Sequence, residues 1–252
     1  MDAFFVDCHS HMLPSGDDGV QTVGEGAALL REAHHRGTRL LFCTPHVFTH
    51  LPLSEHRDQQ IRRRLAELRP QAGLDVRLGF ELTPAVELLE QDPRRYVLEG
   101  TDRVLMEVPF QGDADLLWAL ARHVEDEGLV PVIAHPERTE AVQLRPALAD
   151  ELAEQGWPLQ LNATSLTGRH GIAEARIGWD LVERGVASLV ASDGHRQARP
   201  PFLDEAWRLT VERVGDAAAR PLFDGSALGL ARELGATGSE RPLPSRAMPP
   251  AA

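Results

Sequence analysis

The sequence predicts an α/β protein built on a mainly parallel sheet, which is either closed as a barrel or doubly wound. Short apolar runs of strand length alternate with helical segments along most of the chain, giving seven strand–helix units. The 252 residues, of which 42% are hydrophobic and 25% charged, suit one large domain or two small ones. A chain of this size can bury a sizeable core without disulfides.

The first half of the chain carries clear helix boundaries. Thr22 and Glu25 have the spacing of a capping box, for a helix that runs to Arg36 and ends at Gly37. Ser54 is placed to begin a second helix. The expected elements, in order, are a strand at residues 3–8, the helix to 36, a strand at 39–43, a helix at 54–71, a strand at 75–80, a short helix at 84–91 and a strand at 103–108.

The second half repeats the alternation. Asp113 is placed to cap a helix to Glu127, which Gly128 breaks. Residues 239–252 are rich in Pro, Ala and Ser, and we expect them to form a disordered tail. The other expected elements are strands at 129–134, 159–163 and 186–191, and helices at 145–155, 172–184, 201–214 and 217–234.

The composition argues against several classes of protein. The formal charge is −12 and all 26 basic residues are arginine, which disfavours nonspecific binding to nucleic acid or anionic membrane. No apolar run approaches membrane-spanning length, and the first residues lack the basic region of a signal peptide. Cys8 and Cys43 give no disulfide framework. We therefore expect a cytoplasmic protein without direct membrane insertion; oligomer formation stays open.

Candidate metal ligands stand at the ends of most expected strands. In a barrel of parallel strands the C-terminal ends meet on one face, where active sites lie. A single histidine after a strand is more often a loop residue than a ligand, so it is the recurrence at six strand ends that favours a site. The candidates are His9 and His11 after the first strand, His46 after the second, Glu81 after the third, Glu107 within the fourth, His135 after the fifth, and Asp193 and His195 after the seventh.

The ligand types indicate a cluster of transition-metal ions. Glu107 lies in an apolar run, and a buried carboxylate needs a counter-charge that only arginine or a cation can supply in a chain without lysine. Imidazole and carboxylate without thiolate suit Zn²⁺, Mn²⁺ or Fe. The set exceeds what one tetrahedral ion needs, which favours two or three ions. Such clusters hold hydroxide as a nucleophile near neutral pH and stabilise both oxygens in phosphoryl transfer.

The motifs and their order resemble those of the polymerase and histidinol phosphatase (PHP) superfamily. Within it, the chain is most similar to the manganese-dependent protein-tyrosine phosphatases of bacterial capsule and exopolysaccharide loci. The motifs that carry the resemblance are Asp7-x-His9-x-His11, Asp17-Asp18-Gly19, Thr44-Pro45-His46, Glu81, Glu107, Ala134-His135-Pro136-Glu137-Arg138, Ser192-Asp193-Gly194-His195 and Arg199-Pro200-Pro201.

The resemblance implies a distorted seven-stranded (β/α) TIM-like barrel over residues 1–238, with three metal ions. Arg138 and Arg199 match the phosphate-binding arginines of the family, a role that suits a guanidinium fork; the alternative for both is a surface ion pair. His46 counts among the catalytic residues as well as the ligands. The implied ligand sets are His9, His11, Glu81 and Asp193 for one ion, Glu81, Glu107 and His135 for a second, and Asp18, His46 and His195 for a third.

The implied substrate is a phosphotyrosine protein, namely the tyrosine-rich tail of a bacterial tyrosine kinase that controls polysaccharide export. Histidinol phosphate is the main alternative, followed by a metal amidohydrolase and a non-catalytic metal-binding regulator. The cysteine phosphatase mechanism is excluded, because it needs an arginine six positions after its cysteine. Pro14 and Thr49 occupy those positions after Cys8 and Cys43.

Overall fold

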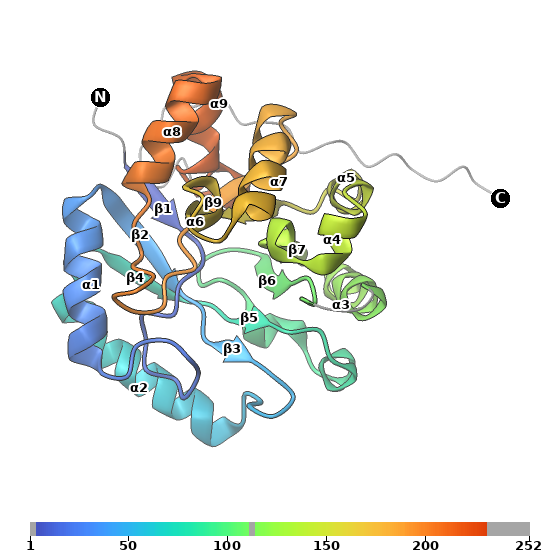
Figure 1. Ribbon diagram of the computed structural model, residues 1–252. Coiled ribbons are helices and arrows are strands. Elements are labelled where there is room, and N and C mark those ends of the chain that lie inside the picture. Colours follow the sequence, from blue (N-terminus) through green and yellow to red (C-terminus); the bar gives the residue numbers. More distant parts are fainter. Residues whose placement is uncertain (1–3, 111–113, 231–252) are drawn as a thin grey trace.

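The computed structural model describes residues 4–110 and 114–230, whose paired β-strands are all parallel (Figure 1). The expected α/β class with a parallel sheet is confirmed. One sheet has the order β1–β2–β4 and the other β3–β5–β6–β7–β8–β9. The strands are β1 (Phe5–Asp7), β2 (Thr38–Cys43), β3 (His46–Val47), β4 (Asp75–Leu78), β5 (Glu81–Leu82), β6 (Arg103–Glu107), β7 (Val130–Ala134), β8 (Leu159–Asn162) and β9 (Leu189–Ala191).

Two positions of the barrel are each filled by an interrupted strand. Two residues separate β2 from β3, and another two separate β4 from β5. Pairing continues across both gaps, because the Gly79 amide donates to Cys43 O at 2.9 Å and the Glu81 amide donates to Pro45 O at 3.1 Å. The nine described segments therefore occupy seven positions. The continuous strand expected at 75–80 is wrong, since Glu81 opens a strand of its own.

A segment around Leu98 enters the barrel wall between β4 and β6 and separates the two sheets at that end. The Leu98 amide donates to Arg103 O and the Glu99 amide donates to Leu78 O, both at 2.8 Å. Gly79 lies where this segment passes. A Cβ at that position would come within 2.3 Å of Leu98 Cδ2, so a larger residue here would force the buried Leu98 side chain to move.

The barrel closes between β9 and β1 through the residues of two ligand motifs. Ser10 and Gly194 form a parallel bridge. The His11 amide donates to Gly194 O at 2.6 Å, and the Asp193 amide donates to His9 O at 2.9 Å. Closure of the ring therefore brings both motifs to the same end of the barrel.

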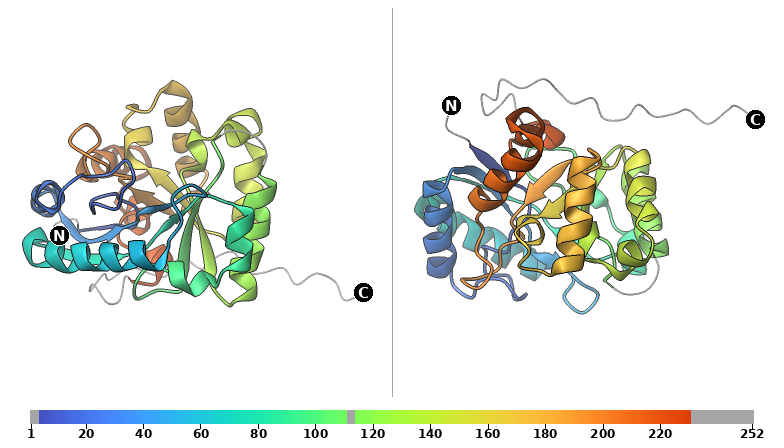
Figure 2. Two further views of the ribbon diagram at one scale, coloured as in Figure 1. Left: turned by 90° about the horizontal axis from the view of Figure 1, so that it is seen from below. Right: turned by 45° about the horizontal axis from the view of Figure 1, so that its top comes forward.

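Helices cover the outside of the strands (Figure 2). The expected cap of the first helix is confirmed, because the Glu25 amide donates to Thr22 Oγ1 at 3.1 Å. The second helix likewise begins with a bond from the Arg57 amide to Ser54 Oγ. The helices are α1 (Val23–His35), α2 (Glu55–Ala72), α3 (Asp115–Asp126), α4 (Glu140–Leu144), α5 (Ala147–Glu154), α6 (Ala163–Leu166), α7 (Ile172–Glu183), α8 (Asp204–Val214) and α9 (Asp216–Ala219).

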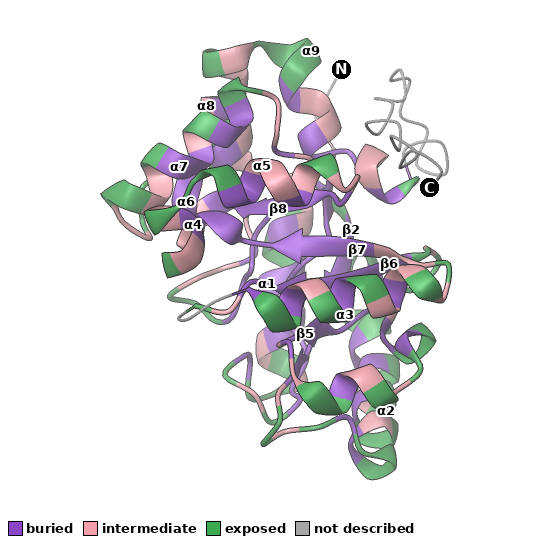
Figure 3. Cartoon of the chain, turned by 90° about the vertical axis from the view of Figure 1, so that its right-hand side faces the viewer, coloured by how far each residue is buried: buried purple, intermediate pink, exposed green. Residues whose placement is uncertain are grey.

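The strands separate two apolar layers, as the alternation of side chains along β2 shows. Leu40 and Phe42 belong to a cluster inside the barrel, together with Val132 of β7. Leu41 and Cys43 face the other way, into the cluster that the helices cover. Figure 3 shows the result, with buried strands at the centre and helices whose exposed residues face outward.

The expected helix at 217–234 is wrong for the described part of the chain. The structure has α9 followed by two 3₁₀ turns, Arg220–Leu222 and Ser226–Leu228. Gly225 and Gly229 adopt φ of 80° and 77°, left-handed values that end a helix and that glycine favours.

Smaller corrections concern other helices. The segment expected at 201–214 begins only at Asp204, α4 was not expected, and the short helix near 84–91 is a 3₁₀ helix over Val86–Glu90. The cap expected at Asp113 and the tail expected at 239–252 lie outside the described residues. No helix in the described ranges is both long and apolar enough to cross a membrane.

Candidate metal centre

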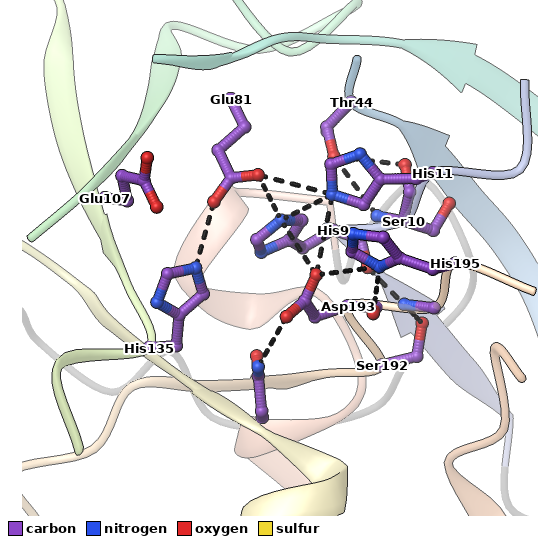
Figure 4. Close-up of polar contacts among 12 residues, drawn as sticks. His9, Ser10, His11, Thr44, Glu81, Glu107, His135, Ser192, Asp193 and His195 are labelled. Atoms are coloured by element: carbon purple, nitrogen blue, oxygen red, sulfur yellow. Dashed lines mark hydrogen bonds and ion pairs between the residues drawn. The ribbon is translucent and has the colours of Figure 1, made fainter. Parts of the chain in front are cut away.

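The candidate ligands meet at the carboxyl ends of the strands, and Figure 4 labels all of them except Asp18 and His46. Most are enclosed, and His9 and Glu81 are completely buried. Asp18 differs, since 68% of its side chain is exposed. The convergence expected from a parallel barrel is therefore present. The buried candidates are His9, His11, His46, Glu81, Glu107, His135, Asp193 and His195.

All nine candidates fall into four overlapping groups, each of which could hold a metal ion. Within each group, one ligand atom from every residue lies within 4.8 Å of the others. Four residues belong to two groups each, so neighbouring ions would share ligands. The groups are His11, Asp18, His46 and His195; His9, Glu81 and His135; His9, His11 and Asp193; and His46, Glu81 and Glu107.

These groups differ in part from the three sets that the resemblance implies. The expected set of Asp18, His46 and His195 stays together, and His11 joins it. Another is divided, because Glu107 and His135 fall into different groups that share Glu81. Every candidate residue still belongs to a group, but some residues that were expected to bind the same ion fall into different groups.

Glu81 lies at the centre of the cluster, with four imidazoles around its carboxylate. Its Oε2 is 3.0 Å from His9 Nε2, 3.2 Å from His11 Nε2 and 3.0 Å from His46 Nδ1. Its Oε1 is 2.9 Å from His135 Nε2. A carboxylate with a different imidazole on each oxygen can bridge two ions.

The geometry of these contacts fits a metal ion better than direct hydrogen bonds. Glu81 Oε2 and His46 Nδ1 are buried and close, yet neither has an aligned hydrogen-bond partner. Atoms that ligate one ion have this relation, since both point at the ion and not at each other. Burial alone would raise the pKa of Glu81, but His46 and His9 outweigh it and hold the pKa well below its ordinary value. The Glu81 carboxylate is therefore ionised.

The pKa of Glu107 is shifted in the opposite direction from that of Glu81. Burial, with the charge of Glu81 beside it, raises its pKa to about 7. Thr83 Oγ1 donates to it, and no arginine in the described residues pairs with it. Of the two counter-charges that the sequence allowed, no arginine in the described residues supplies one, whereas Glu107 lies in a group with His46 and Glu81 that could hold a metal ion.

Two candidate ligands have unusual backbone conformations. His135 (φ 34°) and Asp193 (φ 48°) are the non-glycine residues with positive φ in the described ranges. Such conformations cost about 1–3 kcal/mol each and persist where the surroundings impose them, often at functional sites. Here His135 follows β7 directly and Asp193 comes two residues after the end of β9, and both turn a candidate ligand toward the cluster.

Arg138 and Arg199 lie beside Asp193 and are not surface ion pairs. Arg138 Nη1 donates to Asp193 Oδ2 at 2.9 Å, and Arg199 Nη1 is 3.6 Å from the same oxygen. Their side chains are 20% and 24% exposed. Each guanidinium thus touches the cluster and also reaches solvent, which suits binding of an anion; we call this solvent-facing side of the cluster, marked by Arg138 and Arg199, the opening.

Aromatic rings border the cluster, a feature that the sequence did not reveal. Phe110 stacks on His135 with ring centroids 5.5 Å apart, and it also lies 5.1 Å from Arg138 Cζ. Phe48 stacks on His46 at 4.4 Å. Phe110 is 44% exposed, so one aromatic side chain is open to solvent next to the ligands.

Other buried polar residues support the ligands, although no role was expected for them. Asp7 accepts hydrogen bonds from the His9 and Ser192 amides, and burial raises its pKa to about 6. Asp17 accepts from the His46 amide at 3.1 Å. Both aspartates belong to motifs noted in the sequence, which was the available signal.

Two amides, Gln160 and Asn162, enter the site from β8, a strand for which no site residue was expected. Both are completely buried. Gln160 contacts His9 and Asn162 contacts Asp193. Polar residues in an apolar strand are the same signal that singled out Glu107, so this pair could have been noticed.

We expect Cys8→Ser and Cys43→Ser to keep most of the activity. Both thiols are buried and free. Burial raises the pKa of both, that of Cys43 to about 12, so neither is a thiolate at neutral pH. Steady-state kinetics on folded, metal-loaded variants test this. A loss of about 10⁴-fold or more, the scale of a missing nucleophile, would contradict it.

The fold and the site together define a class of protein. A parallel α/β barrel gathers eight buried histidines and carboxylates in overlapping metal-binding groups at its strand ends. Two partly exposed arginines adjoin the groups. This arrangement is that of a metal-dependent hydrolase acting on an anionic substrate.

Comparison with known proteins identifies the family. The family described as "Capsular polysaccharide synthesis, CpsB/CapC" matches residues 5–229. The tyrosine-protein phosphatase YwqE of Bacillus subtilis is 32% identical over 198 residues, covering 75% of this chain and 77% of YwqE. The putative tyrosine-protein phosphatase CapC of Staphylococcus aureus is 28% identical over 207 residues, covering 79% of this chain and 80% of CapC.

Solved structures agree. A structure from work on YwqE of Bacillus subtilis and CpsB of Streptococcus pneumoniae, described as unique metal-dependent tyrosine phosphatases, superposes with a TM-score of 0.77. It is 28% identical and covers 90% of this chain and 94% of that chain. The phosphotriesterase homology protein of Escherichia coli superposes with a TM-score of 0.55 at 9% identity, covering 88% of this chain and 97% of that chain, which shows likeness of fold alone.

The chain therefore belongs to the CpsB/CapC family of capsular polysaccharide synthesis. Its class is metal-dependent tyrosine-protein phosphatase. The family and the enzyme class expected from the motifs are both confirmed.

Proposed function

We propose that this protein hydrolyses phosphotyrosine in a protein substrate in the cytoplasm, namely the tyrosine-rich tail of a bacterial tyrosine kinase that regulates capsule or exopolysaccharide synthesis. The observation that carries the proposal is the position of Arg138. One guanidinium contacts both the ligand Asp193 and the exposed ring of Phe110. A phosphoryl group and its aryl leaving group would both lie within its reach.

The ligand chemistry supports two or three divalent transition-metal ions, with Mn²⁺ preferred and Fe or Zn²⁺ as alternatives. Five of the nine candidate ligands are histidines, which suit these ions and which Mg²⁺ accepts poorly. When bound, such ions neutralise phosphoryl oxygens and lower the pKa of water enough to supply hydroxide as the nucleophile. The protein's part is to hold the ligands at strand ends and the arginines at the opening.

Arg138 and Arg199 suit the phosphoryl group. Both are partly exposed next to the cluster, and a guanidinium binds phosphate oxygens through paired N–H donors. Their charge also reaches His170, whose pKa is lowered to about 4, first by burial and then by these two arginines. His170 is thus neutral at physiological pH and leaves the positive charge at the opening to the arginines.

The aromatic border supports an aryl substrate. Phe110 and Phe48 stack on two different ligand histidines. Offset or edge contacts between aromatic rings contribute about 0.5–1.5 kcal/mol beyond their buried area. A tyrosyl ring can make such contacts, whereas the flexible polar chain of most phosphorylated metabolites cannot.

A comparison of substrates and metals on one preparation tests the proposal. Metal-stripped protein is expected to be inactive, and Mn²⁺ is expected to restore turnover of a phosphotyrosine peptide better than Mg²⁺ does. Zn²⁺ and Fe²⁺ are added in parallel, and histidinol phosphate serves as the competing substrate. Full activity of stripped protein in Mg²⁺ alone would contradict the metal assignment. Preference for histidinol phosphate would replace the proposed substrate.

A further inference from the structure

Two buried amides form a continuous hydrogen-bonded chain between two candidate ligands. Gln160 and Asn162 lie two residues apart on β8, so both side chains point to the same face of the strand. His9 Nδ1 is 2.9 Å from Gln160 Oε1, and Gln160 Nε2 donates to Asn162 Oδ1 at 2.9 Å. Asn162 Nδ2 donates to Asp193 Oδ2 at 2.7 Å. All four residues are buried.

The hydrogen bonds that link these four side chains can run in only one direction. An ionised carboxylate accepts and never donates, so Asn162 must present its NH₂ group to Asp193. Its oxygen then faces Gln160, which must present its own NH₂ group. The remaining oxygen of Gln160 can only accept, so the proton between it and His9 has to be on His9 Nδ1.

The tautomer of His9 follows from this direction. A neutral imidazole with a proton on Nδ1 has its lone pair on Nε2. His9 Nε2 is the atom that faces the cluster, 3.0 Å from Glu81 Oε2 and 3.5 Å from Asp193 Oδ1. Because Nδ1 keeps its proton, Nε2 is the nitrogen whose lone pair is left for an ion when one binds.

The same chain orients Asp193. Its Oδ2 accepts from Asn162 and from Arg138, whereas its Oδ1 lies 3.5 Å from both His9 Nε2 and His11 Nε2. One oxygen is thus held by donors and the other faces the histidines. If Arg138 turns to a phosphoryl group, Asn162 still holds the carboxylate.

We infer that Gln160 and Asn162 are positioning residues of the metal centre: the chain His9–Gln160–Asn162–Asp193 sets the imidazole tautomer at one end and the carboxylate orientation at the other. The inference rests on the metal site of the proposed function but not on its substrate. Its tests therefore use Zn²⁺ binding and imidazole protonation, which do not depend on which phosphoester is hydrolysed.

The first test observes the wild-type protein. Protein labelled with ¹⁵N-histidine is examined by NMR with and without Zn²⁺, and His9 is assigned by the signal that disappears in His9→Gln. The inference predicts that His9 Nδ1 keeps its proton both without Zn²⁺ and with it, and that Zn²⁺ binds at Nε2. Loss of the Nδ1 proton, or Zn²⁺ bound at Nδ1, in the wild-type protein would overturn the inference.

The second test breaks the chain at its middle. Gln160→Met keeps the approximate size but removes both the donor and the acceptor. Zn²⁺ affinity, measured by competition with a chelator, is expected to fall by about 10–100-fold, the usual effect of losing such a partner. In the Zn²⁺-loaded variant, the NMR signals of His9 should then show binding through either ring nitrogen. Unchanged affinity with an unchanged tautomer would overturn the inference.

Matched variants separate positioning from simple loss of a buried hydrogen bond. Thr210→Val removes a buried hydroxyl that donates to Ala206 O at 2.7 Å, remote in sequence from the ligands, and should leave Zn²⁺ affinity unchanged. Asn162→Leu and Arg138→Ala each remove one donor from Asp193 Oδ2. Only Asn162→Leu is expected to weaken Zn²⁺ binding, and an equal loss in both variants would contradict the role of the chain.

Discussion

Protein carrying Glu81→Gln is expected to purify with little bound metal and to lose phosphotyrosine turnover by about 10³-fold or more. Glu81 contacts four imidazoles through its two oxygens. It also belongs to two of the four metal-binding groups. An amide of the same shape keeps one neutral oxygen and puts an NH₂ group where the other oxygen would ligate. Loss of metal charge costs several kcal/mol of transition-state stabilisation, and each 1.36 kcal/mol is tenfold in rate.

Glu137→Gln is the matched control. Glu137 is also a completely buried carboxylate near the strand ends, but it belongs to none of the metal-binding groups in the described residues. Glu137 accepts hydrogen bonds from the backbone N–H of Asn162 and from Ser165 Oγ. Burial raises the pKa of Glu137 to about 7. The amide oxygen can still accept. Elemental analysis should find full metal in Glu137→Gln and a deficit in Glu81→Gln; full metal and full turnover in Glu81→Gln would contradict the bridging role.

Arg138→Ala is expected to keep its metal ions and yet turn over about 10²–10³-fold more slowly, the usual cost of losing one preorganised charge partner. A guanidinium has no lone pair to offer a metal, so its removal leaves the ligands intact. Asp193 retains its bond from Asn162 at 2.7 Å. The loss should appear with small aryl phosphates as well as with peptides, because the contact is to the phosphoryl group.

Arg196→Ala serves as the control for this variant. Arg196 lies in the same loop as Arg199, but it pairs with Glu25 at 3.1 Å and its side chain is 51% exposed. Its replacement should leave both metal content and turnover unchanged. Wild-type turnover in a fully metallated Arg138→Ala protein would mean that Arg199 or the metal ions alone bind the phosphoryl group.

Much of the site was predictable because its residues recur at one kind of position, the end of a strand, more often than chance would place them there. Ligand-type side chains after successive apolar runs need only the parallel topology to converge, and the structure has seven strand positions with the candidate ligands at one end. The sequence does not show how far each candidate ligand is buried. It therefore could not reveal that Asp18 is the exposed member of its group.

The remaining features depend on contacts between distant segments. The break between β2 and β3 includes Pro45, which has no N–H to donate to the neighbouring strand. The break between β4 and β5 includes Gly79, against which Leu98 packs. A local sequence pattern carries no information about a contact with a residue far along the chain. The amide chain on β8 was missed for a related reason, because Gln160 and Asn162 are not typical ligands and acquire meaning only from His9 and Asp193 at its ends.

Titration of metal-stripped protein with Mn²⁺ tests the central claim, that overlapping ligand groups hold a multinuclear centre for phosphotyrosine hydrolysis. Bound metal per chain and turnover of a phosphotyrosine peptide are measured in the same samples. Because four residues each belong to two groups, we expect turnover to rise steeply only as a second ion binds and to reach its maximum with two or three ions per chain. Maximal turnover with one ion per chain, or with none, would contradict the account.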